Sequence, residues 1–335
     1  MKILLYTEGL KTIGKSGLGK AIKHQMKALE YENIEYTLNP KDDYDILHIN
    51  TYYAKSFFLA KEAKKKGKKI VFHAHSTEED MKNSFVGVGT LSPVIKKWLV
   101  KCYKLGDVIV TPTPYSRKLL ENYKGLGKKK IYDVSNGIEI EFFKKDKKLG
   151  EKFRKKYNFS KDDKVIMGIG LYIKRKGIID FIELARRMPE YKFIWFGYSP
   201  LKASTKEVRD AFKSKPVNII FPGYVEQDVI KGAMSGADLY IFPTLEETEG
   251  IPIIEACACK IPAIVRDIPI FDGWLEHGKN VYKAKNVDEF EVLIKKFFNN
   301  ELKDLTEEAY KVAETRDLRI IGKKLKKIYE DVLKK

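Results

Sequence analysis

The sequence has few cysteines and no long apolar segment. Its 335 residues include only Cys102, Cys257 and Cys259, whose spacing matches neither a zinc site nor a thioredoxin motif and gives no disulfide framework. No run of about 18 apolar residues could span a membrane. An apolar leader is also missing, because Met1 is followed directly by a strand-like segment. We therefore expect a reduced, cytoplasmic protein without structural zinc.

Acidic residues are also in the minority. The 46 Asp and Glu are outnumbered by 64 Lys and Arg, which gives a net charge of +18, and residues 1–150 carry +12 of this excess. Such a charge suits a nucleic acid, an anionic membrane or a phosphorylated substrate. A solvated surface in a lysine-rich protein explains it equally well. No nucleic-acid-binding module is recognisable, so we expect no nucleic-acid partner.

Short β-rich runs alternate with amphipathic helical stretches along the whole chain. The predicted strands are Lys2–Thr7, Tyr44–Ile49, Lys69–His73, Val108–Thr111, Lys130–Val134, Val165–Leu171, Phe193–Gly197, Val217–Phe221, Asp238–Phe242 and Ala263–Arg266. Strands separated by helices indicate crossover connections and parallel sheets.

Residues 139–163 break this alternation and mark a domain boundary. We expect an α/β protein with two doubly wound, Rossmann-like domains, residues 1–142 and 143–317, whose strand carboxyl ends face a shared cleft. Residues 318–335 are expected to form a C-terminal helix that can pack back on the first domain.

Two candidate sites lie in the first domain. The loop Lys15-Ser-Gly-Leu-Gly-Lys20 places Gly17 and Gly19 at a helix entry, where backbone N–H groups can bind a diphosphate; a tight turn explains them equally well. His73-Ala-His75 ends a strand. We expect the two rings on opposite faces if the strand continues, or His75 pointing out into the cleft if the strand ends, so we do not expect the pair to chelate a metal. A histidine at the carboxyl end of a strand can donate a hydrogen bond to a sugar or an oxyanion. A purely structural histidine is the alternative.

A turn in the second domain carries three consecutive cations. The segment Gly170-Leu-Tyr-Ile-Lys-Arg-Lys-Gly177 follows a predicted strand and precedes a helix. Cations at the carboxyl end of a strand could neutralise a diphosphate leaving group. Solvated lysines at an exposed turn are the alternative.

A second motif in that domain pairs two carboxylates. Glu247 and Glu255 are eight residues apart and flank a predicted helix entry at Gly250 and Ile251. Carboxylates with backbone donors between them suit a ligand with many hydroxyl groups. Favourable interaction with the helix dipole explains acidic residues near the start of the helix, but it explains Glu255 poorly, since Glu255 lies among Ile and Ala.

The segment Leu91–Leu105 has the pattern of a basic amphipathic helix. Trp98 lies on its apolar stripe, and Lys96, Lys97 and Lys101 lie on the other side. Such a helix can lie in a membrane interface. Packing against the core of the first domain, with a solvated lysine face, explains the pattern as well.

Together these motifs resemble those of the retaining glycosyltransferases of family 4, which have the GT-B fold. The signature is Glu247, seven residues, Glu255 and then Ala-Cys-Ala-Cys-Lys-Ile-Pro. Further segments resemble the bacterial α-galactosyl- and α-glucosyl-glucosyldiacylglycerol synthases, which add a second hexose to monoglucosyl-diacylglycerol. They include Asp45-Ile-Leu-His-Ile-Asn-Thr, His73-Ala-His-Ser-Thr-Glu-Glu-Asp and Thr111-Pro-Thr-Pro-Tyr-Ser, and the similarity extends to about Trp274.

The resemblance implies roles for individual residues. Glu255 would bind the donor ribose, Glu247 would touch the transferred hexose, and His75 would hydrogen-bond that hexose near the reacting carbon. Lys176 would hold the diphosphate together with backbone donors at Gly17, Gly19, Gly250 and Ile251. The family usually has Arg where this chain has Leu171. Arg175 or Lys174 then supplies the second cation, or Lys176 suffices.

The resemblance also implies the reaction. A hexose would pass from UDP-glucose or UDP-galactose to a membrane glycolipid such as monoglucosyl-diacylglycerol, with retention of configuration and without a metal or cofactor. The enzyme would be peripheral, on an anionic surface at the inner face of the cell membrane. One alternative is a soluble family 4 enzyme acting on a polysaccharide or a lipid-linked oligosaccharide. The other is a non-catalytic nucleotide-sugar-binding protein.

Overall fold

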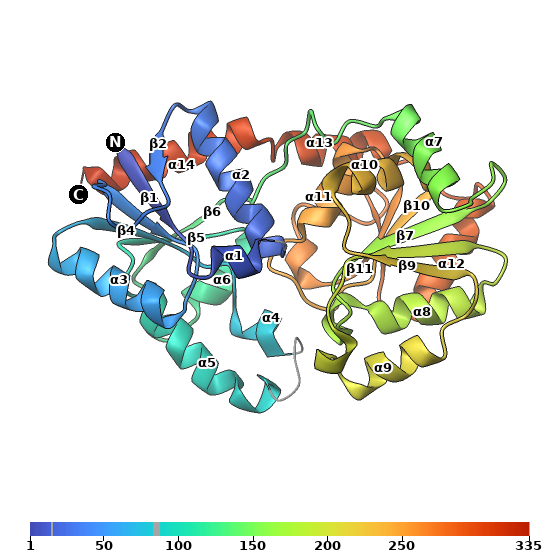
Figure 1. Cartoon of the computed structure of the whole chain (residues 1–335), viewed down its shortest axis with the longest axis horizontal. Coiled ribbons are helices and arrows are strands. Elements are labelled where there is room, and N and C mark those ends of the chain that lie inside the picture. The colour runs from blue at the N-terminus through green and yellow to red at the C-terminus, as the bar shows by residue number, and fades with distance from the viewer. Residues whose placement is uncertain (15, 83–87, 335) are drawn as a thin grey trace. The chain divides into compact units, whose positions relative to one another are not determined.

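The chain folds into two compact units, which are shown in Figure 1. The computed structural model describes residues 1–14, 16–82 and 88–334. The first unit comprises Met1–Met81, Thr90–Glu139 and Arg316–Lys335, and the second is built on the segment Ile140–Thr315. After Glu139 the chain passes into the second unit, and it returns to the first at Arg316.

A parallel sheet with the strand order β2-β1-β3-β4-β5-β6 forms the centre of the first unit. Its strands are β1 (Lys2–Tyr6), β2 (Glu35–Thr37), β3 (Ile46–Ile49), β4 (Lys69–His73), β5 (Val108–Thr111) and β6 (Lys130–Asp133). The helices in this part of the chain are α1 (Leu10–Ile13), α2 (Gly17–Tyr31), α3 (Ala54–Lys65), α4 (Glu78–Lys82), α5 (Val88–Tyr103), α6 (Pro114–Glu121) and α14 (Leu318–Leu333).

Alternate residues of these strands pack against helices on opposite faces of the sheet. On one face, Ile3, Ile46, Val71 and Val108 join the apolar side chains of α2 and α14 in one core. On the other face, the next residue of each strand joins side chains of α3, α5 and α6 in a second core. Figure 1 shows α2 and α14 along one face of the sheet and α3 and α5 along the other. Because these strands are buried on both faces, their sequences are nearly continuous apolar runs.

The C-terminal helix α14 packs directly on α2. A Cβ atom at Gly322 of α14 would lie 2.4 Å from the carbonyl oxygen of Ala28, so only glycine permits this close approach. Around that point, Leu325, Ile328 and Tyr329 are almost fully buried in the first unit. The last turns of the chain thus complete a core that begins with the third residue.

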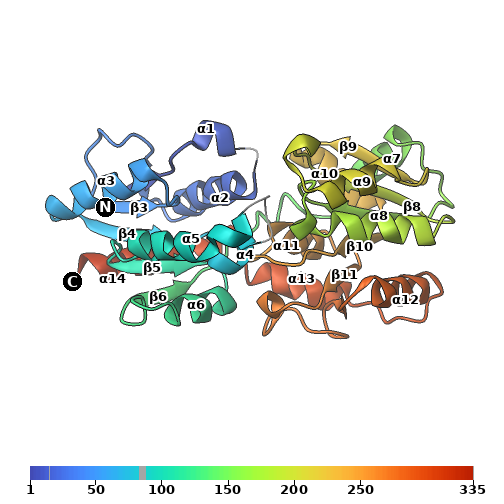
Figure 2. The same ribbon diagram turned by 90° about the horizontal axis from the view of Figure 1, so that it is seen from below.

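The second unit contains another parallel sheet, with the order β12-β11-β10-β7-β8-β9. Its strands are β7 (Val165–Ile169), β8 (Lys192–Phe196), β9 (Ile219–Gly223), β10 (Leu239–Phe242), β11 (Ala263–Arg266) and β12 (Tyr282–Ala284). Its helices are α7 (Lys147–Lys156), α8 (Ile178–Arg187), α9 (Lys206–Lys213), α10 (Gln227–Gly236), α11 (Ile251–Ala258), α12 (Val287–Phe298) and α13 (Thr306–Glu314). In Figures 1 and 2, α8 and α9 lie side by side along one face of this sheet.

These two doubly wound parallel sheets confirm the predicted α/β fold class. The edge strands β2 and β12 were not predicted, because three residues are too short to give a periodic signal. Helices α1, α4 and α10 were not predicted either. The helix predicted over Leu91–Leu105 is α5, which begins three residues earlier, at Val88, while the side chain of Leu91 lies outside the described residues. Of the described helices, none is long and apolar enough to cross a bilayer.

Candidate active site

The three cations of the second unit form a short turn between β7 and α8. Lys174–Lys176 is one turn of 3₁₀ helix and ends at Gly177, whose φ is +73°. A Cβ atom at Gly177 would lie 2.1 Å from the carbonyl oxygen of Pro243, in the loop that follows β10. The turn and that loop therefore touch through their backbones, which only glycine allows here.

This contact brings Glu247 to the predicted cations. Glu247, which is 8% exposed, forms an ion pair with Lys176, and the Nη1 atom of Arg175 lies 3.7 Å from its Oε2 atom. Burial disfavours the ionised carboxylate, but Lys176 and Arg175 outweigh it and hold the pKa of Glu247 below its usual value. The site thus keeps a charged carboxylate beside two cations.

Backbone hydrogen bonds fix the loop on which Glu247 lies. The carbonyl oxygen of Arg175 accepts from the backbone N–H of Leu245 at 2.7 Å and from the Thr244 hydroxyl at 3.1 Å. The Nη1 atom of Arg175 donates to the carbonyl oxygen of Glu246 at 2.9 Å. Arg175 therefore orients the loop through its backbone as well as its side chain.

A buried arginine that the sequence analysis did not single out supports the same loop. Arg266 at the end of β11 is 4% exposed, forms an ion pair with Asp180 of α8 and donates to the carbonyl oxygen of Pro243 at 3.2 Å. The alternation of strands and helices gives no signal for such a contact. It depends on which loop approaches the strand end, and only the fold determines that.

The second carboxylate lies on α11, the helix that this loop opens. Gly250 occupies the N-cap with φ +91°, Ile251 is the first helical residue, and Glu255 is 1% exposed. Glycine has no side chain with which to cap the first N–H groups of the helix. This end of α11 therefore presents backbone donors and the positive end of the helix dipole.

The glycine loop of the first unit forms the start of α2. Ser16 is the N-cap, and its Oγ atom accepts from the N–H of Gly19 at 3.2 Å, so that donor is already used within the helix. A Cβ atom at Gly17 would meet nothing within 4 Å, and its φ is not positive. The fold itself therefore does not require glycine at position 17. Lys15, in the same motif, lies outside the described residues.

The two histidines of the His73-Ala-His75 motif stack on each other. Their ring centroids are 3.9 Å apart and their planes differ by 7°. The expectation that they lie on opposite faces is wrong, because residues two apart on an extended chain point to the same side. The Nε2 atom of His75 lies 3.0 Å from Oδ1 of Asn50, so His75 donates to Asn50 and its Nδ1 atom is left as an acceptor.

Burial keeps the histidines of this unit neutral. Desolvation lowers the pKa of His48 and of His75 to about 3 each. Burial and the nearby Lys20 lower the pKa of His24 to about 4, although its Nδ1 atom contacts the carbonyl oxygens of Asn136 and Gly137. Among the described residues, no group of three His, Cys, Asp or Glu side chains could hold a metal ion.

The candidate membrane residues on α5 differ in their surroundings. The Nε1 atom of Trp98 donates inward to the carbonyl oxygen of Tyr52 at 2.7 Å, and its ring packs against Phe57. Lys96 pairs with Glu78 at 2.8 Å. Lys97 and Lys101 are exposed. Contacts within the first unit therefore take up much of the surface of the Trp98 side chain.

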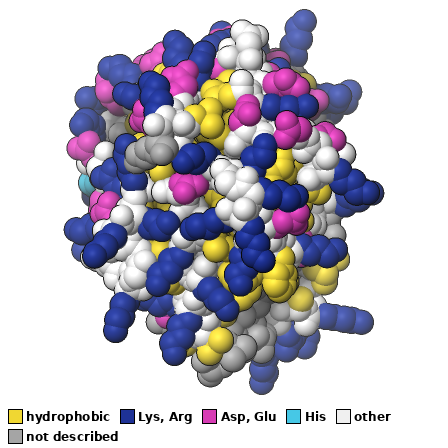
Figure 3. Space-filling model, turned by 90° about the vertical axis from the view of Figure 1, so that its left-hand side faces the viewer, with side chains coloured by type: hydrophobic (Ala, Val, Ile, Leu, Met, Phe, Trp, Pro, Cys, Tyr) yellow, Lys and Arg dark blue, Asp and Glu magenta, His cyan; other side chains and the backbone are white. Residues whose placement is uncertain are grey.

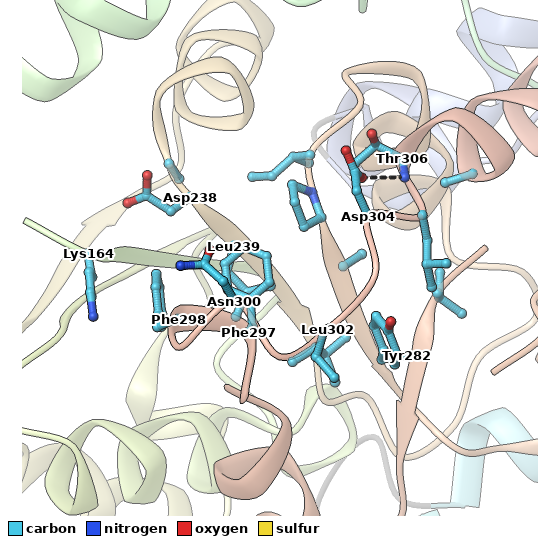
Figure 4. Close-up of a pocket in the computed structure, with 18 of the residues that line it drawn as sticks. Lys164, Asp238, Leu239, Tyr282, Phe297, Phe298, Asn300, Leu302, Asp304 and Thr306 are labelled. Carbon is cyan, nitrogen blue, oxygen red and sulfur yellow. Dashed lines mark hydrogen bonds between the residues drawn. The ribbon is translucent and has the colours of Figure 1, made fainter. Parts of the chain in front are cut away.

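A pocket of about 540 Å³ lies at the opposite edge of the second sheet, where β7, β10 and β11 begin. Figure 4 shows Lys164, Asp238 and Asp304 among the residues that line it. Asp238 accepts from Arg154 and from the backbone of Val165, and Asp304 accepts from the backbone of Thr306. These carboxylates have structural partners, and none of the predicted site residues lines the pocket.

Comparison with known proteins identifies the family. Residues 150–314 match the family described as glycosyl transferases group 1, and residues 29–142 match glycosyltransferase family 4. The chain is 42% identical over 334 residues to the processive diacylglycerol α-glucosyltransferase of Acholeplasma laidlawii. The matched region covers 100% of this chain and 99% of that one. The chain is a family 4 glycosyltransferase.

Other relatives agree with this assignment. The glycosyltransferase is 24% identical over 323 residues to the α-galactosylglucosyldiacylglycerol synthase of Streptococcus pneumoniae, covering 93% of this chain and 84% of that one. Its fold matches that of the Anabaena protein HepE, solved in complex with UDP and glucose, with a TM-score of 0.80, 17% identity and coverage of 98% and 99%. The predicted family and GT-B fold are confirmed.

The buried histidines predict how the stability of the glycosyltransferase depends on pH. Their folded pKa values of about 3 to 4 lie below the ordinary value of 6.5, so the unfolded chain binds more protons in between. The contribution of these histidines to the free energy of unfolding should be constant above about pH 7.5 and fall below it, by about 1.4 kcal/mol per histidine at pH 5.5. Urea unfolding at pH 7.5 and 5.5 measures this. His24→Asn should reduce the slope, and equal stability at both pH values would contradict the prediction.

Proposed function

We propose that this glycosyltransferase moves a hexose from a UDP-sugar to a diacylglycerol glycolipid such as monoglucosyl-diacylglycerol. The observation that carries the proposal is the end-to-end identity of 42% with a diacylglycerol glucosyltransferase. The similarity to a galactosylglucosyldiacylglycerol synthase supports the same acceptor class. The match in fold to a protein solved with UDP and glucose supports a UDP-sugar donor.

In this proposal the second unit binds the donor. Lys176 and Arg175 neutralise the diphosphate, and N–H groups at Gly250 and Ile251 add hydrogen bonds at the start of α11. The position of Arg175, 3.7 Å from Glu247, supports it as the cation that replaces the family arginine at Leu171. Glu247 binds the transferred hexose, and Glu255 binds the ribose.

The first unit contributes the glycine loop and His75. The open space around Gly17 supports a close approach of the donor, since the fold gives no other reason for glycine there. The N–H of Gly19 donates to the Ser16 hydroxyl, so the close approach is proposed at Gly17. His75, with Nδ1 left as an acceptor, can bind a hydroxyl of the hexose near the reacting carbon.

The proposed chemistry is transfer with retention of configuration and without a metal or cofactor. The bond between the anomeric carbon and the diphosphate oxygen breaks, and negative charge develops on the leaving group. Fixed cations and N–H donors stabilise that charge. An acceptor hydroxyl attacks the same face of the sugar, and its proton passes to the leaving phosphate oxygen.

The first test is a product assay with both donors and both acceptors. UDP-glucose and UDP-galactose are each offered with diacylglycerol and with monoglucosyl-diacylglycerol in vesicles, in the presence of a metal chelator. We expect one of the two donors to give a diglycosyl lipid. NMR of this product should show that the new linkage is α. No transfer to either lipid, or a β linkage, would contradict the proposal.

The second test replaces Glu247. Glu247→Gln keeps the size of the side chain and removes the charge that Lys176 and Arg175 face. Transfer should fall by a factor of about 100 or more, as for the loss of one transition-state contact. Affinity for UDP, measured by calorimetry, should stay or rise, since a negative charge near the phosphates is lost. Undiminished turnover would defeat this site assignment.

We further propose that the enzyme is cytoplasmic and peripheral, and that the first unit contacts the inner face of an anionic membrane. Phe58 of α3 is 65% exposed and Val94 of α5 is 64% exposed. In place of the inward-facing Trp98, these two side chains can make apolar contacts with the membrane. Lys97 and Lys101 on α5 are exposed as well. Figure 3 shows basic side chains spread among hydrophobic ones over one side of the first unit. Basic residues with exposed apolar side chains are typical of interfacial binding.

Vesicle sedimentation at low salt tests the membrane proposal. Lys97→Ala with Lys101→Ala should weaken binding to vesicles containing phosphatidylglycerol about 30-fold, given about 1 kcal/mol for each basic residue. Phe58→Ser should weaken it too, through the loss of apolar burial. Val217→Ser is the matched control, because Val217 is a fully exposed apolar residue of the second unit. Failure of the unaltered protein to bind anionic vesicles, or equal effects of all variants, would refute it.

A further inference from the structure

A chain of buried side chains connects the C-terminal helix with the histidine pair of the first unit. The Tyr329 hydroxyl on α14 lies 2.6 Å from Nδ1 of His48 on β3, although 281 residues separate them. The Nε2 atom of His48 lies 3.2 Å from Nδ1 of His73 on β4. Gln25 of α2 also reaches that Nδ1 atom, at 2.6 Å. Four elements of the first unit are thus linked through two imidazoles, those of His48 and His73.

The direction of the hydrogen bonds follows from the protonation of the groups. Burial raises the pKa of Tyr329 well above its ordinary value, so the hydroxyl keeps its proton. Within the described residues its one hydrogen-bond partner is His48, so Tyr329 donates and Nδ1 of His48 accepts. A neutral His48 then carries its proton on Nε2 and donates to His73.

This direction determines the tautomer of His73. Its Nδ1 atom accepts from His48 and from Gln25, so the proton of the neutral ring lies on Nε2. That Nε2 atom is buried and has no hydrogen-bond partner in the part of the chain that the structure describes. An unsatisfied buried donor costs about 1–3 kcal/mol, so native structures rarely keep one without a use.

The stacked rings pass this orientation to His75. With centroids 3.9 Å apart and nearly parallel planes, neither ring can rotate without moving the other. Asn50 holds Nε2 of His75 at 3.0 Å, while its own Nδ2 atom, like Oε1 of Gln25, has no partner among the described residues. Unused donors and acceptors thus remain on the residues that surround the pair.

We propose that Tyr329 and His48 are positioning residues that set the tautomer and the orientation of the His73–His75 pair for a substrate hydroxyl. The unused Nε2–H of His73 and the Nδ1 atom of His75 would then be a donor and an acceptor prepared for that hydroxyl. This inference rests on the proposed function, in which His75 contacts the transferred hexose. It adds a role for a residue of the C-terminal helix that touches no substrate.

The test removes only the hydroxyl of Tyr329 in the full-length protein. Tyr329→Phe keeps the ring in the core, and Tyr36→Phe is the control, since it removes a tyrosine hydroxyl bond to Glu30 elsewhere in the same unit. Turnover of UDP-hexose onto vesicles should fall about ten-fold in Tyr329→Phe, with KM for the donor changed less than about two-fold. Tyr36→Phe should leave both unchanged.

A spectroscopic readout separates positioning from a loss of stability. In protein labelled with ¹⁵N-histidine, long-range ¹⁵N–¹H correlation spectra should show His48 and His73 each as a single Nε2–H tautomer. In Tyr329→Phe both should become tautomer mixtures, with the urea midpoint recorded alongside. If Tyr329→Phe does not fold, His48→Gln and His48→Leu replace it. Gln can still donate to His73 and should retain more turnover than Leu.

His75→Ala distinguishes the two levels of the proposal. If His75→Ala keeps full turnover, the proposed role of His75 fails. If His75→Ala abolishes turnover while Tyr329→Phe, or His48→Leu in its place, leaves turnover and the imidazole spectra unchanged, only the positioning role is overturned. Loss of turnover in His75→Ala, a reduced turnover in Tyr329→Phe and altered tautomers would support it.

Discussion

Parallel pairing within each sheet is the constraint on which the rest of this glycosyltransferase depends. Parallel neighbours require a crossover after every strand, so helices cover both faces and the strands must be apolar on both sides. The same pairing brings the carboxyl ends of all strands in a sheet to one edge. Lys174–Lys176, Glu247 and Arg266 meet there in the second unit, although they are far apart in sequence.

Charge compensation then decides which side chains this edge can hold. A carboxylate as buried as Glu247 stays ionised only beside cations, and the 3₁₀ turn supplies two of them. The glycine at position 177 is what lets that turn reach the loop after β10. The ion pair also gives Lys176 and Glu247 a shared role, since a ligand that draws one of them away alters the charge that the other faces.

The fold class was predictable because strand and helix periods alternate clearly along most of the chain. The three-residue strands β2 and β12 were not predictable, since so few residues carry no period. The sequence indicated Lys176, Arg175, Glu247 and Gly250 as site residues through their positions after strands, and the structure joins the first three. It gave no signal for Arg266, whose partners depend on how the loops pack.

The histidine cluster shows a different limit of sequence analysis. His48 and Asn50 lie within a recognised motif, and their places at and just after the end of a strand offered a signal that was not used. Tyr329 offered none, because only the packing of α14 on the first sheet brings it to His48. The two-residue period of a strand predicts that His73 and His75 lie on the same side, so their stacking could have been predicted, but the opposite was expected.

The return of α14 to the first unit has a consequence for the order of events during synthesis. The face of the first sheet formed by Ile3, Ile46 and Val71 has its final cover only when Leu325 and Tyr329 have left the ribosome. At roughly 5–20 residues per second, the 281 residues between His48 and Tyr329 take between about a quarter of a minute and a minute. During that time one apolar face of the first sheet is not fully covered. The second unit can therefore finish folding before the first.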